Sequence, residues 1–278
     1  MKFRTLGNAS VSIVGQGTWN MEGDDSAQAV RALKRGLDLG MNHIDTAEMY
    51  GDGKVERLVA RAIDGRRGDA FLVSKVMPGN ASYRGTLQAC EASLKRLGTD
   101  YLDLYLLHWP GNHPLEETMR AFDELAEAGK IRAYGVSNFD VPGLEEAVRL
   151  AGPNRIACNQ VLYHLQERTV ERQVMPWCEE YGVAVVGYSP FGSGRFALRG
   201  ERAKVLGEVA SSRGASPRQV TLAFLTRRES LFAIPKSSNH DHVEENHQAS
   251  EIELSQAELE QLEKAFPVGR RQSGVPTL

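Results

Sequence analysis

Residues 70–107 read AFLVSKVMPGNASYRGTLQACEASLKRLGTDYLDLYLL. An apolar run opens this stretch at 70–73, and a second run closes it at 102–107. Between them, residues 82–97 have the apolar spacing of an amphipathic helix, and Gly98 supplies a C-terminal stop. Two strands joined by a helix of this length pair in parallel, because the helix carries the chain back across the sheet. The stretch therefore predicts one β/α/β unit.

The same alternation continues in both directions along the chain. Further helical patterns cover 25–39, 54–63, 114–128, 142–150, 170–181 and 240–248. Further apolar runs are 14–17, 41–44, 131–136, 155–158, 183–187 and 231–234. Eight strand–helix units favour a closed (β/α)8 TIM barrel, an α/β fold, over an open doubly wound sheet. The absence of GxGxxG after the first apolar run also counts against a Rossmann-type fold.

Segments at both ends add to the predicted barrel. Residues 3–6 and 10–14 flank the turn dipeptide Gly7-Asn8, so we expect an N-terminal β-hairpin that plugs the N-terminal mouth of the barrel. No linker or low-complexity stretch divides the chain, so we expect a single domain over residues 1–278. Extra helices in the C-terminal part are expected at 201–213, 217–228 and 254–266.

The composition excludes several classes of protein. The 278 residues carry a formal net charge of -3, so there is no electrostatic footprint for nucleic acid. No run of about 18 apolar residues suggests a transmembrane helix, and the N-terminus lacks the apolar stretch of a signal peptide. The cysteines Cys90, Cys158 and Cys178 are few, odd in number and widely spaced. We therefore expect a cytoplasmic protein with reduced thiols and no membrane partner.

Polar residues follow the predicted strands. The C-terminal ends of barrel strands meet on one face, where barrel enzymes place their active sites. The polar residues at the ends of successive strands are separated by about the length of one β/α unit. Only the last interval is longer, because it contains extra helices. The polar ends, in chain order, are Asp45, Ser74-Lys75, His108, Ser137-Asn138, Asn159-Gln160, Tyr188-Ser189 and Lys236-Ser237.

Three of these residues and Tyr50, which follows Asp45 by five residues, predict a specific chemistry. Lys75 is expected beside Asp45 on the next strand end, and this ion pair would keep the lysine charged. A charged Lys75 near Tyr50 stabilises phenolate, so we expect the pKa of Tyr50 to fall towards neutral and make it a general acid. His108 can hydrogen-bond the oxygen that Tyr50 protonates. This set suits protonation of a carbonyl oxygen while a nucleophile reaches the carbon.

The ordered motifs resemble those of the aldo-keto reductase family, in a bacterial-type member with short loops. The resemblance covers essentially the whole chain and implies hydride transfer from a nicotinamide cofactor to a small aldehyde or ketone. Its catalytic tetrad maps onto Asp45, Tyr50, Lys75 and His108, with Tyr50 as the proton donor. The motifs are Gly17-Thr18-Trp19, residues 43–51, Val73-Ser74-Lys75, residues 106–110, residues 135–139, Asn159-Gln160, Tyr188-Ser189-Pro190 and residues 234–237.

The resemblance also implies a set of cofactor-binding residues. Ser137, Asn138 and Gln160 would hold the carboxamide, and Tyr188 would stack on the nicotinamide. The segment after Tyr188 would lie along the pyrophosphate, and the segment after the last strand would hold the adenosine end. These two segments contribute Ser189, Phe191, Gly192 and Ser193, and then Lys236, Ser237, His242, Glu245 and Asn246.

One position departs from the family pattern. The common NADPH-binding form carries arginine where this chain has His242, and neutral histidine cannot form a bidentate contact with phosphate. A charge-assisted hydrogen bond contributes about 1.5–3 kcal/mol. Loss of such a bond would reduce the preference for NADPH over NADH by about ten- to hundredfold. Because Lys236 and Ser237 remain, NADPH is the expected cofactor, with NADH as an alternative.

The resemblance places the substrate beside an apolar wall. Trp19, Met49, Met77 and Trp109 would form this wall near Tyr50 and His108. The loop at 109–114 is short, and only twelve residues follow Phe266, so we expect an open, permissive pocket. A monomer is the family default.

Three other functions can be weighed against the reductase. A Schiff-base aldolase would need Lys75 without a fixed carboxylate partner, and Asp45 argues against this. A regulatory subunit that binds NADPH with little turnover is a further alternative. A metal site at His240, His242 and His247 is not expected, because residues two apart on a helix point in different directions.

Overall fold

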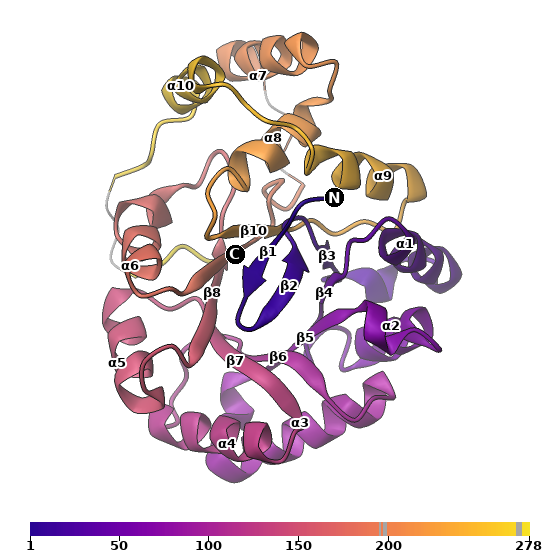
Figure 1. Ribbon diagram of the computed structural model, residues 1–278, viewed down its shortest axis with the longest axis vertical. Helices are drawn as coiled ribbons and strands as arrows, with labels where there is room; N and C mark the ends of the chain where they lie inside the picture. Colours follow the sequence, from indigo (N-terminus) through magenta and orange to yellow (C-terminus); the bar gives the residue numbers. More distant parts are fainter. Residues whose placement is uncertain (195, 197–198, 271–273) are drawn as a thin grey trace.

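The computed structural model describes residues 1–194, 196, 199–270 and 274–278. Within them, eight parallel strands follow one another around a barrel in chain order (Figure 1). Backbone hydrogen bonds close the barrel between its first and last strands: Gly15 N donates to Ala233 O at 2.8 Å, and Gly17 N donates to Pro235 O at 3.0 Å. The predicted (β/α)8 barrel is therefore confirmed. Its strands are β3 (Gln16–Gly17), β4 (His43–Asp45), β5 (Phe71–Val76), β6 (Leu102–Leu107), β7 (Ile131–Ser137), β8 (Ile156–Leu162), β9 (Ala184–Tyr188) and β10 (Leu231–Ile234).

Helices surround the barrel, and their ends follow the capping residues of the sequence (Figure 1). The N-cap side chains of Asp25, Ser82 and Asp140 each accept a backbone N–H of the first turn. None of the helices in the described part is long and apolar enough to cross a membrane. The α-helices are α1 (Ser26–Asp38), α2 (Lys54–Ile63), α3 (Tyr83–Leu97), α4 (Leu115–Glu127), α5 (Val141–Ala151), α6 (Val174–Glu180), α7 (Gly200–Ser212), α8 (Pro217–Leu225), α9 (His240–Ala249) and α10 (Gln256–Ala265). Short 3-10 helices are η1 (Met21–Gly23), η2 (Arg67–Asp69), η3 (Pro78–Asn80) and η4 (Thr169–Arg172).

The N-terminal hairpin lies across the middle of the barrel in Figure 1. Its strands β1 (Phe3–Leu6) and β2 (Ala9–Ser12) are antiparallel, and they turn at Gly7 with a φ of 59°. Leu6 and Val11 are buried in a core cluster that includes residues from the N-terminal ends of the barrel strands. The hairpin therefore covers the N-terminal mouth, as predicted, and the C-terminal ends remain for a site.

The strands differ from the prediction at the ends that matter for the site. Apolar runs at 41–44, 70–73 and 155–158 predict strands that stop before Asp45, Lys75 and Gln160. In the structure, these three polar residues lie inside β4, β5 and β8. The hydropathy pattern ends these strands too early, because a polar side chain can continue a buried strand when it is hydrogen-bonded to another buried group.

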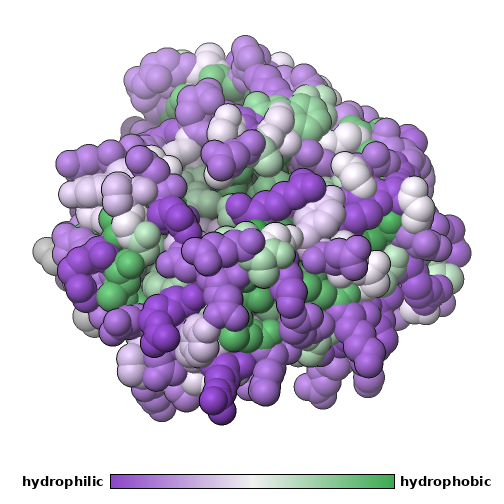
Figure 2. Space-filling model, turned by 60° about the horizontal axis from the view of Figure 1, so that its bottom comes forward, coloured by the Kyte–Doolittle hydropathy of each residue, from purple (hydrophilic) through white to green (hydrophobic). Residues whose placement is uncertain are grey.

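The helical segments also differ in two places. The predicted helix 170–181 is divided into η4 and α6, and the predicted helix 217–228 already ends at Leu225. The surface seen in Figure 2 is largely hydrophilic, and hydrophobic residues show on that face only in small patches. Most of the apolar side chains that define the sequence periodicity are buried beneath it.

We predict opposite stability effects for two glycine-to-alanine substitutions. At Gly135, where the β7–β8 register shifts, an added Cβ would lie 2.6 Å from the Cys158 carbonyl oxygen. Gly135→Ala should therefore lower the free energy of unfolding by about 1–3 kcal/mol through overpacking. In the matched control Gly207→Ala, in α7, the Cβ would meet nothing within 4 Å, so helix propensity should raise stability by about 0.5–1 kcal/mol. Urea unfolding measures both, and equal effects would contradict this account of Gly135.

Candidate active site

A cavity of about 800 Å³ opens at the C-terminal ends of the strands. Its walls come from the strand ends, from the loops that follow them and from the C-terminal segment. The lining residues are Gly17, Thr18, Trp19, Asp45, Met49, Tyr50, His108, Trp109, Pro110, Ser137, Asn138, Asp140, Gln160, Tyr188, Ser189, Ile234, Lys236, Gly274, Val275, Thr277 and Leu278. Most of the predicted site residues are thus brought together at one place.

A buried ion pair lies at the floor of this cavity. Lys75 Nζ donates to Asp45 Oδ1 at 2.6 Å and to the Thr46 carbonyl oxygen at 2.8 Å. The Lys75 side chain is 0% exposed. Burial lowers the pKa of Lys75, but Asp45 and Tyr50 raise it by more, so its pKa lies above the usual value. Lys75 is therefore charged, as the sequence predicts.

Tyr50 lies above this pair, in the loop between β4 and α2. Its hydroxyl oxygen accepts a hydrogen bond from Lys75 Nζ at 3.3 Å. Burial is the largest influence on the pKa of Tyr50 and raises it, while Lys75 lowers it; the net pKa lies above the usual 10. The expected fall towards neutral is therefore wrong for this structure, because the loss of water around a phenolate outweighs the nearby ammonium. At neutral pH, Tyr50 carries its proton and can donate it.

His108 follows β6 and faces Tyr50 across the cavity floor. Their ring centroids are 5.8 Å apart in an edge-on arrangement. Burial, with a smaller contribution from Lys75, lowers the pKa of His108 to about 2, so the imidazole is neutral. Nδ1 of His108 is buried and has no hydrogen-bond partner among the described residues. A neutral imidazole carries one N–H donor, and the residue lines the cavity.

Polar side chains cross-link strand ends on both sides of the cavity. Gln160 Nε2 donates to Asp45 Oδ2 at 2.7 Å, which satisfies the second oxygen of the carboxylate. Asn138 Nδ2 donates to the His108 carbonyl oxygen at 3.1 Å, and Tyr188 Oη donates to Asn138 Oδ1 at 3.0 Å. Ser137 Oγ donates to the Gln160 carbonyl oxygen at 2.9 Å. These bonds fix the wall of the cavity beside His108.

Lys236 marks the opposite end of the cavity and is paired with Asp24. Ser238 Oγ also donates to Asp24 Oδ2, at 2.5 Å. Asp24 lies between η1 and α1 and belongs to no strand-end motif of the sequence. Only the adjacent acidic pair Asp24-Asp25 signals it, and Asp25 is the N-cap of α1.

Several predicted residues lie outside the cavity lining. Met77 is held by its backbone N–H, which donates to Glu48 Oε1 at 2.7 Å, while Phe191 and Gly192 line a separate small cavity. His242 is exposed on α9, and Asn246 is buried there. The other predicted residues that do not line the cavity are Ser193, Ser237, Glu245 and Lys75, whose side chain is fully buried beneath the cavity floor. Among the residues that the structure describes, no group of three His, Cys, Asp or Glu side chains could hold a metal ion.

The C-terminal segment contributes lining that the sequence analysis missed. Gly274, Val275, Thr277 and Leu278 border the cavity, whose mouth was expected to be open because the tail is short. No periodicity or motif in these residues signals such a position. The tail reaches the cavity because tertiary contacts direct it there.

Comparisons with known proteins agree with this geometry. Methylglyoxal reductase YeaE of Escherichia coli is 47% identical over 94% of this chain and 93% of its own length. Glyoxal reductase of Bacillus subtilis is 34% identical over 90% of this chain and 87% of its own length. An aldo/keto reductase of Klebsiella pneumoniae, solved with NADP and acetate, is 41% identical with a TM-score of 0.93, over 100% of this chain and 99% of that one.

The family model described as the Aldo/keto reductase family matches residues 14–266, which includes the barrel and every residue of the cavity floor. The eight-stranded barrel with its N-terminal hairpin is the fold of the structural neighbours as well. The resemblance found in the sequence motifs is thereby confirmed, and the chain belongs to the aldo/keto reductase family.

Proposed function

We propose that Asp45, Tyr50, Lys75 and His108 form the catalytic group of a reductase for small carbonyl compounds, with α-ketoaldehydes such as methylglyoxal as the favoured class. The contact of Lys75 Nζ with both Asp45 and the Tyr50 hydroxyl, opposite His108, carries this proposal. The chain is an NADP-dependent oxidoreductase by its family. The substrate class follows the names of its relatives in Escherichia coli and Bacillus subtilis.

The cavity offers groups for the nicotinamide end of the cofactor and a cation for a 2′-phosphate. The Tyr188 ring offers a flat surface at its wall, and Ser137, Asn138 and Gln160 place polar groups beside it. Asp45 accepts one N–H of Gln160 Nε2, so the second N–H and the amide oxygen of Gln160 remain for a carboxamide. Lys236, at the other end, supplies the positive charge for a 2′-phosphate. NADPH therefore fits best, and the exposed His242 keeps NADH as an alternative.

The four catalytic residues divide the work on the substrate. The bound cofactor supplies a hydride to the carbonyl carbon. His108, neutral, donates a hydrogen bond that orients the carbonyl oxygen, and Tyr50 transfers its proton to that oxygen. Lys75 stabilises the phenolate that remains, and Asp45 keeps Lys75 charged. Hydride and proton together convert the carbonyl to an alcohol.

The environment of Lys75 disfavours Schiff-base chemistry. A nucleophilic lysine needs a depressed pKa, whereas the pKa of Lys75 is raised and its ammonium is paired with Asp45. We therefore expect no borohydride-trapped adduct with a carbonyl substrate.

We further propose that the protein is a cytoplasmic monomer. All three cysteines are free and buried, and the absence of a disulfide among the described residues suits a reducing compartment. The hydrophobic patches on the face shown in Figure 2 are small, as on a surface without a permanent partner.

Replacement of the proton donor tests the proposed mechanism. Tyr50→Phe should lower kcat for methylglyoxal at least about 100-fold, the lower range for a positioned general acid, and leave the Kd of NADPH within about twofold. The control Tyr105→Phe removes a buried hydroxyl that has no partner among the described residues, and it should retain normal turnover. Loss of nicotinamide absorbance measures both, and near-normal turnover of Tyr50→Phe would overturn the assignment.

The pKa of His108 predicts a difference between activity and stability as the pH falls. Because this pKa lies at about 2 in the folded protein, the imidazole stays neutral and kcat for reduction should be flat from pH 8 to pH 5. The unfolded chain binds a proton at His108 below about pH 6.5, so the free energy of unfolding should fall by up to about 1.4 kcal/mol per pH unit from this group. An acid limb of kcat near pH 6.5 would show that His108 titrates.

The pairing of Lys236 with Asp24 predicts a gain in cofactor affinity. Asp24→Asn removes a negative charge that competes with a 2′-phosphate, and about 1 kcal/mol for an exposed pair corresponds to roughly fivefold tighter NADPH. NADH should change less than about twofold. Asp25→Asn is the matched control, because asparagine also caps a helix. Fluorescence titration measures the Kd of NADPH and of NADH for each variant and for the unmodified chain. Equal shifts of the two Kd values in Asp24→Asn would contradict a phosphate role for Lys236.

A further inference from the structure

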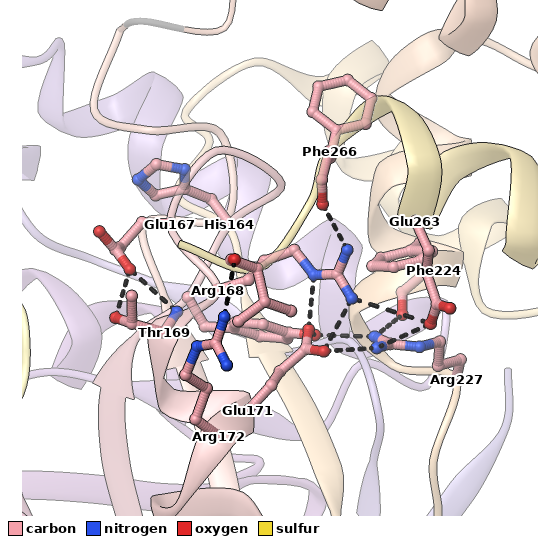
Figure 3. Close-up of polar contacts among 12 residues, drawn as sticks. His164, Glu167, Arg168, Thr169, Glu171, Arg172, Phe224, Arg227, Glu263 and Phe266 are labelled. Atoms are coloured by element: carbon pink, nitrogen blue, oxygen red, sulfur yellow. Dashed lines mark hydrogen bonds and ion pairs between the residues drawn. The ribbon is translucent and has the colours of Figure 1, made fainter. Parts of the chain in front are cut away.

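A charged cluster lies outside the cavity, between the end of β8 and the C-terminal helix α10 (Figure 3). Arg168 donates to both oxygens of Glu171 at 2.7 Å, and Arg227 donates to Glu171 Oε2 at 3.1 Å. The side chains of Arg168, Glu171 and Arg227 are 2%, 6% and 8% exposed. The guanidinium groups of Arg168 and Arg227 also lie over the Phe224 ring, at 4.8 and 3.9 Å from its centroid. The catalytic group uses none of these residues.

The cluster is permanently charged and is tied to a strand of the active site. Burial raises the pKa of Glu171, but the two arginines and the Tyr163 hydroxyl lower it further, to about 2. Tyr163 Oη donates to Glu171 Oε1 at 2.6 Å and accepts from Arg227 at 2.7 Å. Tyr163 directly follows β8, the strand that carries Gln160 into the cavity. The cluster is thus joined by hydrogen bonds to the residue that follows that strand.

Arginines of this region hold the backbone that leaves α10. Arg168 Nη1 donates to the Phe266 carbonyl oxygen at 2.5 Å. Arg172 Nε donates to the Gly269 carbonyl oxygen at 2.6 Å, and its Nη2 donates to that of Val268 at 3.2 Å. Figure 3 shows the Arg168 side chain reaching Phe266 on one side and Glu171 on the other. Three carbonyls after the end of a helix are therefore bound by two side chains.

The held segment leads directly to the cavity wall. Gly269 lies five positions before Gly274, the first described residue of the tail that lines the cavity. A chain of five residues spans at most roughly 17 Å, so an anchor at Gly269 keeps Gly274 near the mouth. Without that anchor, the unrestrained segment before Gly274 would begin at Ala265, the end of α10. Because this segment would be longer, fixing Gly274 at the cavity would cost more conformational entropy. Val275 also packs against the main core cluster.

We propose that Arg172, supported by the Arg168–Glu171–Arg227 cluster, is a positioning residue for the substrate pocket: it holds residues 266–269 so that residues 274–278 form one wall. This inference rests on the proposed function only in taking the cavity as the carbonyl site. Arg172 touches neither the cavity nor the four catalytic residues, so it acts on the substrate through the tail.

A double-mutant cycle tests this role with 4-nitrobenzaldehyde and NADPH. Arg172 is exposed, so we expect the Arg172→Ala variant to fold. The substitution should raise KM for the aldehyde about five- to tenfold, while kcat and the Kd of NADPH stay within about twofold. Arg172→Lys keeps one charged donor and should recover part of the loss. A chain truncated after Arg270 should show a raised KM by itself, and Arg172→Ala should add less than about twofold in that background. Arg228→Ala, which removes an exposed contact to Glu179, is the matched control and should behave as the unmodified chain.

Three outcomes would overturn the proposal. These are an unchanged KM in Arg172→Ala, an unchanged KM on truncation, or equal effects of Arg172→Ala in the full and truncated chains. Quenching of Trp19 and Trp109 fluorescence gives the Kd of the aldehyde without turnover, since both indoles line the cavity. The double-mutant cycle can thus be repeated with the Kd of the aldehyde in place of KM. If the variants change this Kd as expected but the protein does not reduce the aldehyde, the result would count against the proposed function and not against the role of Arg172.

Discussion

The geometry of the site depends on one buried ion pair, Lys75 with Asp45. A fully buried ammonium must be compensated inside the protein, and removing either partner would leave an uncompensated charge. The second oxygen of Asp45 is satisfied by Gln160 on β8, which lies four strands away around the eight-stranded barrel. The pair therefore links opposite sides of the barrel through its interior. The remaining N–H of Lys75 Nζ donates to the Tyr50 hydroxyl. The position of this hydroxyl is therefore set by the barrel strands and by the buried ion pair that they hold.

The cations around the cavity are paired within the protein. Lys75 faces Asp45, Lys236 faces Asp24, and His108 is neutral. The remaining acidic side chain of the lining, Asp140, caps α5. Such a site presents hydrogen-bond donors to an uncharged carbonyl and has no free cation for a substrate carboxylate among the side chains described. This agrees with the proposal of small ketoaldehydes as substrates.

Much of the fold and of the cavity floor can be predicted from the sequence, because both follow from local patterns. Apolar runs of strand length alternate with amphipathic segments, and polar residues at matching strand ends converge in a barrel. The pKa of Tyr50 could not be predicted, since it depends on how much water the fold removes from the hydroxyl. Asp24 and the tail could not be predicted either: their positions arise from contacts with Lys236 and Arg172, which are distant in the chain and leave no periodic signal.

The tail is anchored through its backbone, and this has a consequence for how the family can diversify. Carbonyl oxygens of Phe266, Val268 and Gly269 are the groups that Arg168 and Arg172 bind, and every residue type supplies such an oxygen. Side chains at 274–278 can therefore change without loss of the anchor that places them. Substitution in this short segment can alter the shape of the pocket independently of the barrel and its catalytic floor. The fold thus separates the evolution of substrate choice from the conservation of chemistry.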